Sequence, residues 1–85
     1  MFNVELSSHS KKFLKKCDKI LCERLIDKIK ELSNEPFPQD VKRVVGKKEK
    51  VFRVRVGDYR IQYVVFYQNN IILISDIDKR SNAYE

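Results

Sequence analysis

The segment from Val51 to Tyr63 constrains the fold of this chain more than any other, because it has the pattern of a tight hairpin of two strands. Apolar residues alternate with arginines before Gly57-Asp58, which is the period of a strand with one buried face. Glycine tolerates the positive φ that a two-residue hairpin loop needs at its first position. This loop predicts three cross-strand pairs: Val56 with Tyr59, Arg55 with Arg60, and Arg53 with Gln62.

The predicted hairpin gathers positive charge on one face. Like charges directly opposite each other destabilise a sheet, so an Arg55–Arg60 pair indicates an anionic partner. Residues 42–60 contain eight basic and two acidic side chains and so carry the whole net charge of +6. The eight are Lys42, Arg43, Lys47, Lys48, Lys50, Arg53, Arg55 and Arg60. Such a patch favours nucleic acid or an acidic protein as partner, and a solvated charged surface is the alternative.

Composition argues against several classes of protein. The chain has 85 residues, enough for one small domain, and its longest apolar runs, Tyr63–Tyr67 and Ile71–Ile74, are too short to span a bilayer. Met1–Leu6 is too short and too polar for a signal peptide, so we expect a cytoplasmic protein with no membrane partner. Cys17 and Cys22 should then be reduced and fill space in helices. Two Cys and one distant His do not make a four-ligand zinc site, and we expect no metal and no cofactor.

The N-terminal part of the chain predicts a strand and a helical hairpin. Phe2–Leu6 alternates as a short strand, and the serines at positions 7, 8 and 10 offer N-cap hydroxyls for a first helix. Asp18 can cap a second helix, whose apolar stripe consists of Leu21, Leu25, Ile29 and Leu32. The joint between the helices is so short that they should fold back on each other.

The C-terminal part predicts a sheet. Pro36 and Pro38 end the helical region, Val41–Val45 reads as a short strand, and Gly46–Lys50 as a basic loop. Three or four strands from there to Arg80 should form an antiparallel sheet. We therefore predict an α+β domain of order β-α-α-β-β-β-β, with the N-terminal helical hairpin packed on one face of the sheet.

The length of the last turn decides which side chains join the arginines. A two-residue loop at Asn69-Asn70 would place Arg80 on the face opposite Arg60. A three-residue loop over residues 68–70 would pair Arg60 with Asp78 and bring Asp76 and Arg80 to the arginines' face. We favour the second, which should turn Leu73 and Ile77 toward the helices.

This order of elements, the stretch Val-Phe-Arg-Val-Arg-Val-Gly-Asp-Tyr-Arg-Ile-Gln-Tyr and the closing Arg80-Ser-Asn-Ala-Tyr84 resemble the RelE/ParE toxin superfamily, and an archaeal-type RelE most of all. The resemblance covers nearly the whole chain, so we expect residues 1–85 to form a single RelE-like toxin domain. It implies a ribosome-dependent endoribonuclease that cleaves mRNA in the ribosomal A site. The implied partners are the ribosome, mRNA and a cognate acidic, RelB-like antitoxin, with a toxin–antitoxin heterotetramer as one expected assembly.

The resemblance also implies an active site. Its positions in this chain are Arg53, Arg55, Arg60, Arg80 and Tyr84. Arg60 and Arg80 would stabilise transition-state charge, and Tyr84 would stack on a base or aid proton transfer. Further RNA contacts are expected from the basic segment, at Arg43, Lys47, Lys48 and Lys50. Three of the implied active-site residues have a structural alternative: Arg60 paired with Asp78, Arg80 paired with Asp76, and Tyr84 capping the core edge.

The chain departs from the family at the general base. Well-known RelE enzymes carry lysines before the turn, where this chain has Arg53 and Arg55, and arginine does not deprotonate in proteins. His9 has suitable chemistry but matches no family position, and a single His near a helix start is more often structural. Looser candidates are Lys48, Lys50, Glu49 and Asp78. Alternatively, the ribosome positions the substrate and the arginines need only stabilise charge.

Two other functions remain open on the sequence. One is a ParE-like toxin that binds DNA gyrase without cleaving RNA, since one fold can host different activities. The other is a basic nucleic-acid-binding domain without catalysis. Mutation of Arg60 separates the first from a nuclease, and binding of an antitoxin separates the second from both toxins.

Overall fold

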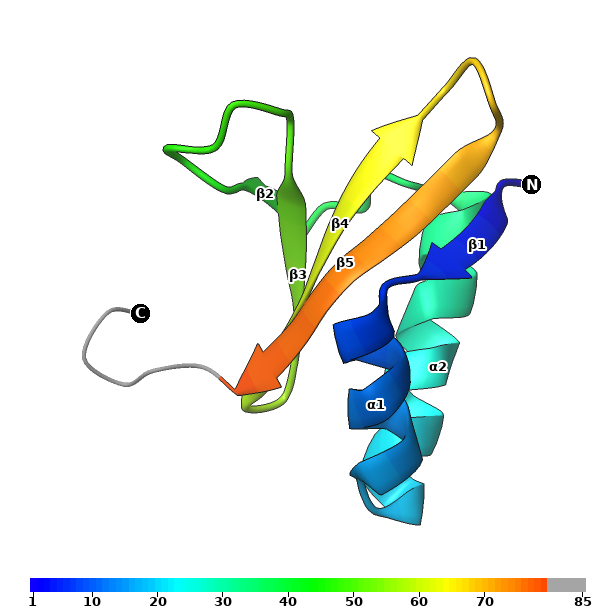
Figure 1. Ribbon diagram of the computed structural model, residues 1–85, viewed down its shortest axis with the longest axis vertical. Helices are drawn as coiled ribbons and strands as arrows, with labels where there is room; N and C mark the ends of the chain where they lie inside the picture. The colour runs from blue at the N-terminus through cyan, green and yellow to red at the C-terminus, as the bar shows by residue number, and fades with distance from the viewer. Residues whose placement is uncertain (80–85) are drawn as a thin grey trace.

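A computed structural model describes residues 1–79, in which two helices cover one face of a five-stranded sheet (Figure 1). The predicted α+β fold with its helical hairpin on one face is confirmed. In chain order the elements are β1 (Asn3–Leu6), α1 (Ser8–Lys16), α2 (Lys19–Asn34), β2 (Lys42–Arg43), β3 (Phe52–Val56), β4 (Tyr59–Phe66) and β5 (Ile71–Lys79).

Both helices begin at predicted caps. The Ser7 hydroxyl accepts a hydrogen bond from the backbone N–H of Ser10 at 3.1 Å, and the Asp18 carboxylate accepts one from Leu21 at 2.7 Å. Each cap satisfies an N–H that the first turn of a helix leaves open. The buried Ser10 hydroxyl also donates to the Ile74 carbonyl at 3.0 Å, which ties α1 to β5.

The core lies between the helices and the sheet. Leu25, Ile29 and Leu32 of the predicted α2 stripe are buried, and Leu21 is half-buried beside them. The strands contribute Val54, Val56, Ile61, Tyr63, Ile72, Ile74 and Ile77 to the same core. Burial of this apolar surface leaves the opposite face of the sheet open for polar side chains.

The predicted hairpin register is confirmed pair by pair. Val56 lies opposite Tyr59, Arg55 opposite Arg60, and Arg53 opposite Gln62. Gly57 has a φ of 59°, the left-handed conformation that the two-residue loop requires. The arginines therefore lie on the side of the sheet away from the helices, because their neighbours Val54 and Ile61 are buried in the core.

The pairing of Arg60 with Asp78 is confirmed, but the predicted loop behind it is wrong. Phe66 pairs with Ile71, so the loop has four residues, and a bulge near Ser75 then shifts the register by one. Before the bulge Ile72 and Ile74 face the core, and after it Ile77 does. Leu73 consequently lies on the open face and not toward the helices, contrary to the sequence prediction. A bulge allows one strand to bury residues on both sides of a register shift.

The sheet differs from a purely antiparallel one at its edge. Its strand order is β1-β5-β4-β3-β2, and β1 runs parallel to β5, as their side-by-side position in Figure 1 shows. The other four strands pair antiparallel as predicted. The strand expected at Val41–Val45 is shorter, only Lys42–Arg43.

Candidate active site

Two rows of cross-strand neighbours organise the open face of the sheet. One row runs from Lys42 through Arg53 and Gln62 to Asp76, and the other joins Arg55, Arg60 and Asp78. Side chains at paired positions share a face and lie about 5 Å apart at Cβ. We call Lys42, Arg53, Arg55 and Arg60 the arginine face; it combines four permanent or near-permanent cations on three strands.

Arg60 is held in place by a carboxylate. Its Nε donates to Asp78 Oδ1 at 2.9 Å, and the Arg60 side chain is 21% exposed. The sequence offered this ion pair as the structural alternative to a catalytic role. The geometry accommodates both, since the bond to Asp78 uses one N–H group and a guanidinium carries five. A planar guanidinium oriented by a carboxylate can also donate to a phosphate.

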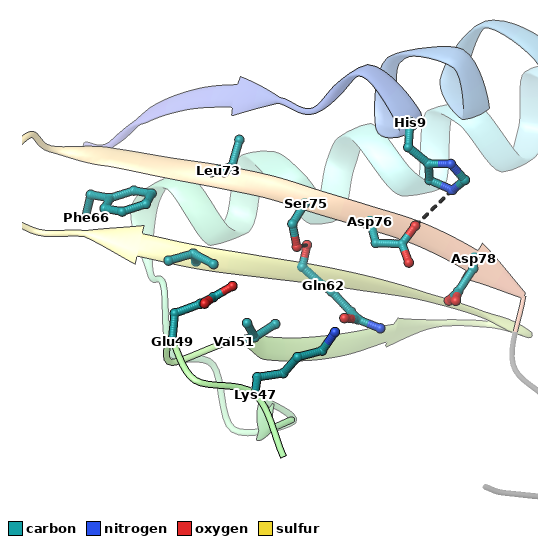
Figure 2. Close-up of a pocket in the computed structure, with 11 residues that line it drawn as sticks. His9, Lys47, Glu49, Val51, Gln62, Phe66, Leu73, Ser75, Asp76 and Asp78 are labelled. Carbon is teal, nitrogen blue, oxygen red and sulfur yellow. Dashed lines mark hydrogen bonds and ion pairs between the residues drawn. The ribbon is translucent and has the colours of Figure 1, made fainter. Parts of the chain in front are cut away.

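A second carboxylate, Asp76, lies next to it on β5 and meets an imidazole. His9, at the start of α1, places Nε2 2.9 Å from Asp76 Oδ1 (Figure 2). Sequence reasoning did not find this pair, because it requires the start of α1 to lie beside β5, so that His9 reaches the open face. Asp76 was instead the expected alternative partner of Arg80. Arg80 and Tyr84, two of the predicted catalytic residues, lie outside the described residues.

A cleft of about 800 Å³ runs across the same face. Figure 2 shows its floor on β4 and β5, with His9 on one rim and Lys47 and Glu49 on the other. The floor is formed by Gln62, Leu73 and Ser75, with Phe66 at one end and Asp76 and Asp78 at the other. Val64 also lines the cleft. Clefts of this size hold small organic groups, and its mixed apolar and charged lining suits a base joined to a phosphate.

The predicted RNA-binding residues are divided by the structure. Lys47 reaches the rim of the cleft, while Lys48 and Lys50 are exposed in the same loop. Arg43 pairs with Phe52, whose ring packs on the core side, so Arg43 belongs to the side of the helices. Its neighbour Lys42 instead joins the arginine face and lines a small hollow with Arg53 and Arg55. The alternation of side chains along a strand would have identified Lys42 had the β2 register been known.

The described residues hold no group of three His, Cys, Asp or Glu side chains that could bind a metal ion, and no helix among them is long and apolar enough to cross a membrane. Cys17 and Cys22 are free, half-buried thiols; Cys22 lies in α2 as predicted, whereas Cys17 caps the end of α1 and is not inside a helix. Both thiols donate to the Leu14 carbonyl, at 3.6 and 3.7 Å. Burial, together with the neighbouring Cys22, raises the pKa of the Cys17 thiol, which disfavours a reactive thiolate.

Sequence comparison shows the family. Residues 4–84 match the family described as the ParE toxin of type II toxin–antitoxin systems, parDE. The chain belongs to this family. It is also 38% identical over 87 residues to a protein of Methanocaldococcus jannaschii named RelE1, covering 99% of this chain and 96% of that protein. The predicted resemblance to the RelE/ParE superfamily is confirmed, and the chain is a RelE-like toxin of the type II toxin–antitoxin class.

Solved structures share the fold. The archaeal RelE–RelB complex from Pyrococcus horikoshii OT3 matches with a TM-score of 0.82 and 27% identity, covering 95% of this chain and 97% of the other. The intact E. coli RelBE toxin–antitoxin complex matches with a TM-score of 0.82 and 17% identity, covering 96% of this chain and 100% of the other. The RelBE2 toxin–antitoxin complex of Mycobacterium tuberculosis matches with a TM-score of 0.79 and 21% identity, covering 93% of this chain and 98% of the other. At their lower identities, the last two matches show the fold alone.

Proposed function

We propose that this toxin is a ribosome-dependent endoribonuclease that cleaves mRNA in the A site. The observation that carries the proposal is the arginine face, where Arg53, Arg55 and Arg60 lie together on the open side of the sheet beside a cleft. Arg55 and Arg60 stand directly opposite each other, and guanidinium groups gathered in this way can bind the oxygens of a phosphate.

The chemistry proposed is attack by the 2′-hydroxyl of the RNA on the adjacent phosphorus. The pentacoordinate transition state carries extra negative charge on its nonbridging oxygens. Arginines that already lie around that position stabilise it without reorganising. Arg60, oriented by Asp78, is the strongest candidate for this role. Arg53, Arg55, Arg80 and Tyr84 complete the proposed site, as the family pattern implies.

The basic loop extends the proposed RNA contact. Lys47 stands on the rim of the cleft, and Lys48 and Lys50 are exposed beside it. Flexible lysines bind phosphates as point charges without defined orientation, so they should contribute affinity and not chemistry. A contact from Arg43 stays a prediction, and it would require the RNA to pass around the β2 edge.

We further propose an acidic, RelB-like antitoxin as the cognate partner, in a hetero-oligomer such as a heterotetramer. The support is the likeness to the RelE–RelB complex of P. horikoshii at 27% identity and the net charge of +6. An acidic partner of a basic toxin associates quickly through complementary fields. Complex formation should abolish cleavage when the two are mixed in equal amounts.

Primer extension tests the proposal. Purified toxin is incubated with a translated mRNA, with and without ribosomes, alongside Arg60→Ala and the control Lys30→Ala on the exposed side of α2. We expect cuts within codons that need ribosomes, vanish in Arg60→Ala and persist in Lys30→Ala. Loss of one such transition-state contact typically lowers the rate by roughly 10²–10³.

A gyrase-binding toxin is the second candidate, because the matching family is described by its ParE member. Its test is supercoiling by DNA gyrase in the presence of the same proteins. Gyrase inhibition without mRNA cuts, unaffected by Arg60→Ala, would replace the nuclease proposal. A protein that binds RNA but neither cuts it nor inhibits gyrase would be the non-catalytic basic domain.

A further inference from the structure

The proposed reaction needs a proton acceptor, and the positions at which the family resemblance leads us to expect lysines hold Arg53 and Arg55 in this chain. Arginine stays protonated in proteins and cannot serve as a base. The open face nevertheless contains one imidazole. His9 lies on the rim of the cleft, with Nε2 2.9 Å from Asp76 Oδ1 (Figure 2).

The pair has the composition of a catalytic dyad. Asp76 Oδ1 is sealed from solvent, and no described residue gives it a fully aligned hydrogen bond. A carboxylate oxygen in that position needs a donating neighbour, and the imidazole is the one at ion-pair distance in the described part of the chain. Its approach through Nε2 favours the tautomer with the proton on that nitrogen. Nδ1 is then left to accept a proton.

The His9–Asp76 dyad is next to the arginine face. Asp76 and Asp78 are two residues apart on β5 and line the same cleft, so their side chains are about 7 Å apart along the strand. Asp76 faces His9, and Asp78 faces Arg60. One nucleotide linkage can therefore contact the imidazole with its sugar and the guanidinium with its phosphate. The His9 side chain is 65% exposed, which leaves its outer edge open to a substrate.

We infer that His9, oriented by Asp76, is the general base of this toxin, an inference that rests on the proposed nuclease function. His9 Nδ1 takes the proton of the 2′-hydroxyl while the 2′-oxygen forms a bond to phosphorus. The bond from phosphorus to the 5′-oxygen breaks, and the leaving oxygen takes its electron pair and a proton from water. The products are a 2′,3′-cyclic phosphate and a 5′-hydroxyl. The imidazolium returns its proton to solvent through its exposed edge.

A pH profile can isolate this imidazole, because its titratable neighbours are of other types. In the cleft they are Lys47, Glu49, Asp76 and Asp78. His9 also lines a second hollow, formed with α2 and β4. The titratable residues of that hollow are Lys12, Lys16, Cys17, Asp18 and Tyr59. Histidine is the side chain whose ordinary titration falls between pH 5 and 8, and the raised pKa of Cys17 moves that thiol further from this range.

The experiment measures single-turnover cleavage of ribosome-bound mRNA between pH 6 and 8.5, with saturating toxin. It compares the wild type, His9→Gln and the control Lys11→Gln, an exposed α1 residue that lines neither hollow. Gln can still donate to Asp76 but cannot exchange protons. We expect the cleavage rates of the wild type and Lys11→Gln to increase with rising pH. The cleavage rate of His9→Gln should be about 100-fold lower and independent of pH. Added imidazole should restore mRNA cleavage by His9→Ala.

The other outcomes separate the two claims. If the wild type cuts but His9→Gln cuts at a similar rate, or slowly with the pH dependence intact, the base assignment is overturned and the nuclease proposal stands. If the wild type cuts no ribosome-bound mRNA, the proposed function itself fails. If His9→Gln does not fold, as a lost melting transition reveals, imidazole rescue of His9→Ala decides: no rescue of a folded His9→Ala overturns the inference.

Discussion

Lys42 and Arg53 form a like-charged cross-strand pair, and we predict that this pair lowers the stability of the free toxin. They face each other across β2 and β3. Asp40 lines the same hollow, but its carboxylate lies 3.1 Å from Lys28 Nζ. Opposed like charges on a sheet cost roughly 0.2–1 kcal/mol. Because Lys42 is exposed to water, a cost of about 0.5 kcal/mol is expected.

Lys42→Gln should therefore stabilise the folded state by about 0.5 kcal/mol, which raises Tm by about 2–4 °C in a domain of this size. Lys42→Glu turns repulsion into attraction and should raise the free energy of unfolding by about twice as much. The matched control is Lys30→Gln, at an exposed position of α2 far from Arg53 in sequence. Lys42→Glu should at the same time weaken mRNA cleavage, so stability and activity move in opposite directions.

Urea unfolding of the free toxin measures the pair directly. A double-mutant cycle of Lys42→Gln and Arg53→Gln should give a repulsive coupling of about 0.5 kcal/mol in low salt. In about 1 M salt the coupling should shrink toward zero, since the Debye length falls to about 3 Å. A coupling that is zero or attractive in low salt would refute the reasoning.

Three further predictions concern stability. Tyr63→Phe removes a hydroxyl that donates to the Pro36 carbonyl and should cost about 1 kcal/mol at pH 7. Burial, then Asp40 and Tyr67, raise the pKa of Tyr63 above its usual value. Its contribution is therefore complete below about pH 10 and is lost above it, as the phenol ionises in the unfolded chain. Gly57→Ala should cost about 1 kcal/mol, since φ is 59° and the new Cβ would lie 3.1 Å from the Arg24 guanidinium. Ser10→Ala should cost about 1 kcal/mol, because the Ile74 carbonyl loses its side-chain donor while it keeps the backbone N–H of Ser7.

Urea unfolding at several pH values checks all three. An advantage of wild type over Tyr63→Phe that persists unchanged at pH 11 would contradict the assigned pKa shift. A neutral Gly57→Ala would mean that the hairpin turn changes conformation at no cost. Ser8→Ala, at an exposed position of α1, is the control for Ser10→Ala. If Ser8→Ala lost stability and Ser10→Ala did not, the link between α1 and β5 would not be stabilising.

Local patterns predicted the elements that depend on neighbours in sequence. The alternation around Gly57 fixes which residues of β3 and β4 face each other, and the caps Ser7 and Asp18 fix where the helices begin. The bulge at Ser75 was not predicted, because no local signal distinguishes it from a shorter loop. It is stabilised by burial of Ile74 and Ile77 on the same face of β5, which is a tertiary effect.

The candidate site was predictable where it lies on the hairpin and not where distant segments meet. The positions of Arg53, Arg55 and Arg60 follow from one turn. His9 reaches Asp76 because β1 pairs parallel with the first half of β5, so the following helix begins beside the middle of that strand. The face of Lys42 depends in the same way on the register of a two-residue strand. Such contacts between residues far apart in sequence leave no periodic signature.

A 2′-deoxy substitution tests the central claim most directly. An mRNA with a single deoxynucleotide 5′ to the mapped cut is bound to ribosomes and treated with the toxin, beside the unmodified mRNA. We predict that the unmodified mRNA gives a fragment ending in a 2′,3′-cyclic phosphate and that the modified one stays intact at that site. Cleavage at the deoxynucleotide, or equal cleavage of both mRNAs without ribosomes, would contradict a ribosome-dependent attack by the 2′-hydroxyl.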